Sequence, residues 1–225
     1  MGVNQMCGRF NLFSLPESVR KHFNLDVQPE FRVDYNIHPG GDILAIMPEA
    51  KAELLHWGFI PFWAKDRKMS YNLINARLET VAEKPSFRAA FKQRHVIIPA
   101  TGYYEWRPIE NGTKQAYHIT RSDQAVFGFA GLWEHWQQGE EAVNSCTIIT
   151  TAANEKMQDI HSRMPVILAP IDYEHWLQLN QPMEALLALL ANASAYDDME
   201  AIPVSNFVNN PRHNGPECIE PVSLP

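Results

Sequence analysis

Short apolar runs separated by turn residues dominate the pattern along the chain. Runs of four to eight apolar or alternating residues bounded by Gly, Pro, Asn, Asp or Ser predict strands. We expect them over residues 43–47, 52–57, 96–99, 102–107, 116–120, 126–133, 145–151, 165–168 and 201–204. Most of these runs are joined by turns too short for a helical crossover, so the sheet should be largely antiparallel.

Apolar residues at helical spacing predict a few short helices between the strands. Ser14 and Glu17 form a capping-box pattern with Pro16 in the first turn. We expect helices over residues 15–24, 86–94, 172–179 and 182–191. The predicted class is α+β, a single domain with a curled or barrel-like β core and peripheral helices.

Composition and charge narrow the possible environments and partners. The chain has 225 residues, three cysteines and a formal charge of −7. An odd number of cysteines in a chain too long to need disulfides favours a reducing compartment, so we expect a cytoplasmic protein. A run of about eighteen apolar residues, which would predict a membrane span, does not occur. The acidic balance argues against broad affinity for nucleic acid, because non-specific binding depends on neutralised phosphates.

Cys7 and Glu105 are the first two candidates for chemistry. Cys7 lies in Met6-Cys7-Gly8-Arg9-Phe10; a cysteine with a free α-amine is a 1,2-aminothiol, which condenses with an aldehyde to form a thiazolidine ring. The alternative is a purely structural role for Cys7, as a small buried cysteine before a Gly turn. Glu105 lies among aromatic residues, where burial would raise its pKa. The alternative is a surface glutamate on an edge strand.

Two polar motifs supply the remaining candidates. Asn75 and Arg77 lie in Ile74-Asn75-Ala76-Arg77, which suits a polar contact and an anion contact. The alternative for Asn75 is a structural hydrogen-bonding residue. His161 lies in a polar loop before an apolar strand, where it could transfer protons or make an ordinary surface hydrogen bond. We find no second ligand at metal-site spacing near His161, so no metal is predicted.

These motifs together resemble the SRAP family, the SOS-response-associated peptidases or abasic-site processing proteins. The resemblance covers the chain from Met6 onward. It rests on motifs that occur in family order: Cys7 to Phe10, Tyr35-Asn36, Pro39-Gly40, Trp57-Gly58, Asn75 to Arg77 with Glu79-Thr80, Tyr104 to Trp106, Thr150 to Ala152, His161 to Pro165, and Pro203 to Ser205.

The resemblance implies a function and a set of site residues. It implies that the protein binds abasic sites in single-stranded DNA and forms a thiazolidine crosslink through Cys7 in the DNA damage response. Asn75, Glu105 and His161 would complete the catalytic site. The DNA contacts would fall on Arg9, Arg77 and Arg163, with Trp63 and Pro39 packing beside the lesion. No cofactor and no membrane partner is implied, and we expect a monomer.

Residues 1–5 depart from the family pattern, because the resemblance requires the cysteine directly after the initiator methionine. We therefore expect a prefix over 1–5 and an SRAP domain over 6–225. Either Met6 is the start, or the prefix is removed, with self-processing as one route. An intact prefix would block thiazolidine formation, because the α-amine would be an amide.

Two other functions remain open. A thiol peptidase would use Cys7 as nucleophile, His161 as base and Asn75 or Glu105 to orient it. A non-covalent single-strand-binding domain would use Trp57, Trp63 and the arginines as a stacking and phosphate platform. The acidic charge counts against the second of these.

Overall fold

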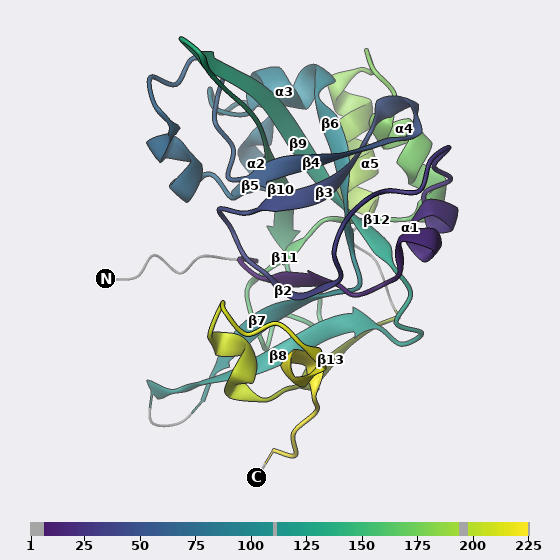
Figure 1. Ribbon diagram of the computed structural model, residues 1–225, viewed down its shortest axis with the longest axis vertical. Coiled ribbons are helices and arrows are strands. Elements are labelled where there is room, and N and C mark those ends of the chain that lie inside the picture. Colours follow the sequence, from purple (N-terminus) through teal and green to yellow (C-terminus); the bar gives the residue numbers. More distant parts are fainter. Residues whose placement is uncertain (1–6, 110–111, 194–197, 225) are drawn as a thin grey trace.

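A closed β-barrel forms the centre of the molecule (Figure 1). The computed structural model describes residues 7–109, 112–193 and 198–224. Five strands pair in a ring, in which β3–β4, β3–β6, β6–β9 and β9–β10 are antiparallel and β10–β4 is parallel. Their bounds are β3 Asp42–Met47, β4 Lys51–Trp57, β6 His95–Ala100, β9 Phe127–Gln138 and β10 Glu141–Ala152. The predicted barrel-like, largely antiparallel core is confirmed.

A second sheet lies beside the barrel, in the lower half of Figure 1. Its strand order is β13-β8-β7-β1-β2, with every pair antiparallel. The bounds are β1 Phe10–Leu12, β2 Asp34–Ile37, β7 Gly102–Pro108, β8 Lys114–Arg121 and β13 Met199–Pro203. The predicted strands over 102–107 and 116–120 pair with each other as β7 and β8, and residues 110 and 111 between them lie outside the described residues.

Three short strands attach to the barrel around β10. β5 (Asn75–Arg77) runs parallel to β10, while β11 (Arg163–Pro165) pairs with it antiparallel; β12 (Ile167–Leu168) joins β9. Thr150 of β10 therefore has Arg77 on one side and Pro165 on the other. This arrangement places two of the sequence motifs on the two sides of the same strand, β10.

Helices cover one side of the barrel, and the apolar core has two main parts. One cluster packs barrel strands against the helices; the other joins the barrel to the second sheet through residues such as Phe10 and Tyr103. The helices are α1 Pro16–His22, α2 Leu78–Val81, α3 Arg88–Gln93, α4 Tyr173–Leu177 and α5 Met183–Ala193, and the 3-10 turns are Pro48–Ala50, Arg67–Asn72, Pro170–Asp172, Asn206–Asn209 and Pro216–Ile219. Within the described ranges, no helix has the length and apolarity needed to cross a membrane.

Several local predictions were wrong in detail. Leu15, not Ser14, is the N-cap of α1, and no side chain caps this helix. Ser14 instead lies 3.2 Å from the Thr101 hydroxyl, so a tertiary contact replaces the predicted cap. The run 165–168 is divided between β11 and β12, and β9 and β10 extend well beyond their predicted ends into a hairpin through Gly139. β1, β2 and β5 were missed because three or four residues give too little periodicity.

Candidate active site around Cys7 and Glu105

Cys7 and Glu105 form the centre of the site. The backbone nitrogen of Cys7 donates to Glu105 Oε1 at 2.8 Å. The Cys7 thiol also hydrogen-bonds to this carboxylate. In the described chain the nitrogen belongs to an amide; in a chain that began at Cys7 the same position would hold the α-amine. One carboxylate thus contacts both groups of the potential aminothiol.

The barrel and the second sheet together bury this pair. β1 runs antiparallel to β7, with Phe10 opposite Tyr103, which brings the start of the chain beside Glu105. Cys7 and Glu105 each expose only 4% of their surface. The surface alternative for Glu105 is therefore wrong: β7 is paired on both sides and is no edge strand, and the face that carries Glu105 lies against the barrel cluster and Cys7.

Burial sets the protonation preferences of the pair. Burial raises the pKa of Glu105, although the interaction with His161 and the hydrogen bonds from Cys7 act in the opposite direction. Burial also raises the pKa of the Cys7 thiol, as does the adjacent Glu105 carboxylate, while Arg163 opposes this. A carboxyl group with a raised pKa can accept and return protons near neutral pH.

His161 and Arg163 approach from the loop before β11. His161 Nδ1 lies 3.2 Å from the backbone nitrogen and from the carbonyl oxygen of Arg163, so its ring is anchored through that atom and Nε2 is the nitrogen left for proton transfer. The Arg163 guanidinium contacts both Glu79 oxygens and donates to the Thr150 carbonyl at 2.8 Å. Thr150 pairs in register with Arg77, two residues after Asn75. The structure thus brings Cys7, Glu105, His161, Arg163 and the Asn75 strand to one region.

The other predicted DNA contacts differ in their exposure to solvent. Arg9 is half-buried; its guanidinium donates to Asn36 Oδ1 at 2.7 Å and to the Val208 carbonyl at 2.9 Å, and it lies 5.8 Å from the Trp106 ring centroid. Arg77 is exposed, and Trp63 exposes 47% of its surface. Trp63 follows the exposed Phe62.

Pro39 lies in a hollow of about 210 Å³ that adjoins the Asn75 strand. Ile74 and the exposed Tyr71 line the same hollow. Phe62 and Tyr71 are aromatic surfaces that the sequence reasoning did not single out.

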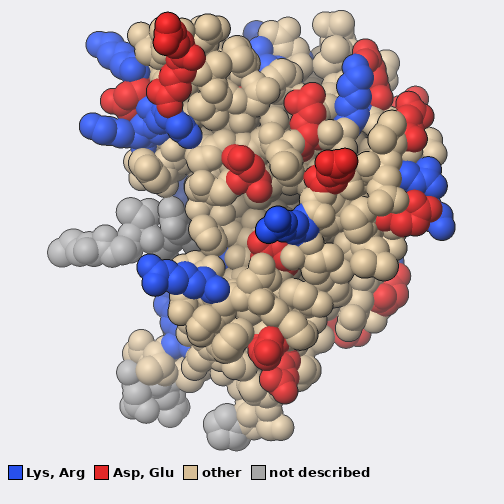
Figure 2. All heavy atoms as spheres, viewed as in Figure 1, with Lys and Arg blue, Asp and Glu red and all other residues tan. Residues whose placement is uncertain are grey.

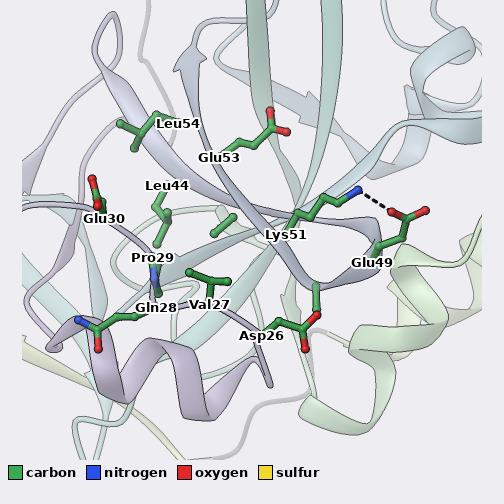
Figure 3. A pocket seen from close by; sticks show the side chains of 12 residues that line it. Asp26, Val27, Gln28, Pro29, Glu30, Leu44, Glu49, Lys51, Glu53 and Leu54 are labelled. Carbon is green, nitrogen blue, oxygen red and sulfur yellow. Dashed lines mark hydrogen bonds and ion pairs between the residues drawn. The ribbon is translucent and has the colours of Figure 1, made fainter.

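The side of the molecule seen in Figure 2 carries no broad patch of positive charge. On the side seen in Figure 2, Lys and Arg are interspersed with Asp and Glu. A pocket of about 600 Å³ beside β3 and β4, drawn in Figure 3, carries the carboxylates of Asp26, Glu30, Glu49 and Glu53. Its Lys51 is paired with Glu49 at 2.6 Å. The negative charge of this pocket would repel phosphate. No group of three potential metal ligands occurs within the described residues.

Comparisons with known proteins decide the family. The family model described as "SOS response associated peptidase (SRAP)" matches residues 6–211. The chain belongs to the SRAP family. It is 44% identical to the abasic site processing protein YoqW of Bacillus subtilis (strain 168), over 96% of this chain and 99% of that protein. It is 32% identical to the abasic site processing protein YedK of Escherichia coli (strain K12), over 96% of this chain and all of the other.

Solved structures share the fold of this SRAP protein. An X-ray structure of a protein from Bacteroides thetaiotaomicron superposes with a TM-score of 0.85 at 27% identity, covering 96% of this chain and all of that one. The resemblance drawn from the sequence motifs, and with it the fold class, is therefore confirmed.

Proposed function

We propose that this SRAP protein captures abasic sites in single-stranded DNA by forming a thiazolidine between Cys7 and the sugar aldehyde. The relatives YoqW and YedK are named abasic site processing proteins. The observation that carries the chemical part is the 2.8 Å contact from the Cys7 nitrogen to a buried carboxylate. The proposal places the reaction in the DNA damage response, as the family description suggests.

The proposed reaction has two bond-forming stages. The α-amine attacks the aldehyde carbon, and loss of one water leaves an imine. The Cys7 sulfur then attacks the imine carbon, while the thiol proton passes to the nitrogen, which closes the ring. Glu105 suits both proton transfers because it contacts the nitrogen and the thiol. An α-amine, with an ordinary pKa of about 7.7–8.0, needs such a base at neutral pH.

The remaining site residues have supporting roles in this proposal. Asn75 holds the linkage by hydrogen bonding, and His161 moves protons through Nε2 during ring opening, reversal or lyase-type strand scission. Arg77 and Arg163 bind the phosphates beside the lesion; Arg163 would exchange its contact with Glu79 for one of them. Arg9 supports the site near Cys7, and Trp63 and Pro39 pack against the flanking nucleotides.

The reaction requires that the Met6–Cys7 peptide bond be absent. The proposal is that residues 1–5, which lie outside the described residues, are absent from the active form or are removed from it, in one route by self-processing. Cys7 has a φ of 45°, in the left-handed region that costs a non-glycine residue about 1 kcal/mol or more. Breaking the Met6–Cys7 bond removes this torsion, so the strain favours release of the prefix.

The thiol peptidase is the second candidate, and the electrostatics of Cys7 count against it as the main activity. A cysteine nucleophile is activated by a neighbouring cation, which lowers the pKa of the thiol. Here burial raises the pKa of the Cys7 thiol, and the Glu105 carboxylate, to which the thiol hydrogen-bonds, raises it further. This arrangement suits proton removal by the carboxylate better than a stable thiolate–imidazolium pair with His161.

The test uses a protein whose chain begins at Cys7 and single-stranded DNA with one abasic site. A denaturing gel should show a slower band with the wild-type protein and none with Cys7→Ala. A matched comparison is Cys146→Ala, since Cys146 is a fully buried cysteine of the barrel. That variant should retain the crosslink.

Two outcomes would contradict the proposal. One is capture at the wild-type rate by a chain that mass spectrometry shows to retain residues 1–6, because that would remove the need for a free amine. The other is peptide turnover by the chain that begins at Cys7 with no DNA crosslink, which would favour the peptidase.

A further inference from the structure

Tyr103 carries a buried hydroxyl that the fold leaves without a hydrogen bond. Only 1% of the residue is exposed, and its hydroxyl has no hydrogen-bond partner among the residues that the structure describes. Leaving a hydroxyl unpaired in an apolar interior opposes folding, and such groups are uncommon in native proteins. A phenylalanine would fill the same space at no such cost, so the hydroxyl calls for an explanation.

The position of Tyr103 supplies that explanation. It precedes Glu105 by two residues on β7, so both side chains lie on the same face of the strand. It pairs with Phe10 of β1, three residues after Cys7, and its ring packs edge-on against Phe129 at 6.1 Å.

The Tyr103 hydroxyl lies within electrostatic range of Cys7 and Glu105 and stays protonated. Burial raises the pKa of Tyr103, and the negative charges of Cys7 and Glu105 raise it further. Tyr103 is therefore a neutral O–H donor within electrostatic reach of both groups.

The proposed ring closure creates a need for such a donor. When Glu105 takes the thiol proton, negative charge develops on a sulfur that is buried beside a carboxyl group. The charge of Arg163 lowers the pKa of the thiol, and that of His161 lowers the pKa of Glu105. The O–H of Tyr103 is a buried hydrogen-bond donor in this region that the fold does not already use.

We propose that Tyr103 is a catalytic residue whose hydroxyl donates a hydrogen bond to the Cys7 sulfur while the thiazolidine ring closes. This inference rests on the proposed aldehyde capture. In the step, the S–H proton goes to Glu105, the S–C bond forms, the C=N electron pair moves to nitrogen, and nitrogen takes the proton back from Glu105. Tyr103 keeps its own proton throughout.

The experiment separates the two stages in a protein that begins at Cys7. Borohydride added at early times reduces the imine to a stable amine crosslink, while a crosslink that forms without reductant reports ring closure. Tyr103→Phe should form the borohydride-trapped imine within about twofold of the wild-type rate. Its ring closure should be about tenfold slower or more, which is the scale of a hydrogen bond to a charged group. The pH profile of ring closure should move to higher pH, because the thiolate loses a donor.

Tyr104→Phe is the matched control from the other face of the same strand. The Tyr104 hydroxyl donates to the Tyr35 carbonyl at 2.7 Å and accepts from Asn11 at 2.9 Å. Its loss should lower the melting temperature and leave ring closure by the folded protein unchanged. Tyr103→Phe should melt at the wild-type temperature or above it.

Three results would overturn the inference. One is ring closure by Tyr103→Phe at the wild-type rate and pH profile. Another is equal slowing of both stages together with a lower melting temperature, which is the signature of a structural role. If the wild-type protein forms no crosslink at all, the proposed function itself fails and this inference fails with it.

Discussion

The two faces of β7 both carry buried aromatic residues with polar groups, but the surroundings of those groups differ. Tyr103 and Glu105 face the barrel cluster and Cys7, whereas Tyr104 and Trp106 face a separate cluster formed with Val208 and Cys218 near the C-terminus. On the second face most polar groups bind each other, although Asn11 Oδ1 has no partner among the described residues. Asn11 joins the Tyr104 hydroxyl to His118, and the Trp106 indole donates to Asn209 at 2.7 Å.

This difference indicates that residues on one face of β7 stabilise the fold, while residues on the other face take part in the proposed reaction. A buried polar network whose members are hydrogen-bonded fixes a single arrangement and leaves little capacity for a ligand. The other face keeps a carboxyl group with a raised pKa and an unbonded hydroxyl beside a thiol. Substitutions on the first face should therefore change folding, and substitutions on the second should change the reaction.

Glu105→Gln should reduce the crosslinking rate more than any other substitution considered below. An amide cannot take a proton from the amine or the thiol, so the crosslinking rate should fall by about 10²-fold or more. Quantitative gels with a chain that begins at Cys7 would measure this. Glu134→Gln is the control, because Glu134 is an equally buried carboxylate that is paired with Arg94 at 2.7 Å, and its loss should reduce stability without slowing the folded protein. Equal crosslinking by Glu105→Gln and wild type would contradict the proposed role.

Glu105→Gln also has a pH signature in the form that keeps the amide at Cys7. The pKa of Glu105 is raised in the folded protein, so its contribution to stability is present below the ordinary pKa of 4.5 and is lost as pH rises through the folded pKa. Glutamine does not titrate, so the variant should gain stability relative to wild type as pH increases. Urea unfolding between pH 5 and pH 8 would show this, and a constant difference would argue against a raised pKa.

His118 should control acid stability on the other face. Burial lowers its pKa from 6.5 to about 4, and with the Asn11 amide donating to its Nε2, protonation would break that bond. Because the folded-state pKa is lowered, the contribution of His118 to the free energy of unfolding is fully present above pH 6.5. It is lost as the pH falls from 6.5 to about 4, and the loss amounts to about 3 kcal/mol. Urea unfolding of wild type and His118→Asn over this range should show a shallower acid loss in the variant. Parallel curves would contradict the assignment.

Gly102→Ala should cause the smallest change of these substitutions. It should lower the stability of the fold and leave the crosslinking rate of the folded protein unchanged. A Cβ at residue 102 would lie 2.1 Å from His118 Nε2 and 2.9 Å from the Ile119 carbonyl, on the Tyr104 side of β7. Crowding of this kind costs about 1–3 kcal/mol in a packed interior. Thermal unfolding measures the loss, with Gly139→Ala as a control for replacing a glycine in open space, although its φ of 61° adds strain. An unchanged melting temperature for Gly102→Ala would show that this face is less tightly packed than described.

Much of the site could be predicted from the order of motifs, but its contacts could not. Asn75, Glu105 and His161 were identified beside Cys7, yet periodicity left open whether Glu105 faces water, because alternation gives two faces and does not say which is covered. Tyr103 was missed as a site residue, although the same alternation places it on the Glu105 face. The engagement of Arg163 with Glu79, 84 residues away in the chain, has no local signal.

The sequence by itself determined the antiparallel strand class, most strand and helix positions, and the family to which this chain belongs, because these depend on local pattern and motif order. Only the tertiary structure decided that β3, β4, β6, β9 and β10 close into a ring and that β1 carries Cys7 to β7. Those pairings join distant segments, and their burial sets the pKa of Glu105. The meeting of the Cys7 nitrogen with Glu105, 98 residues later, is therefore a property of the fold.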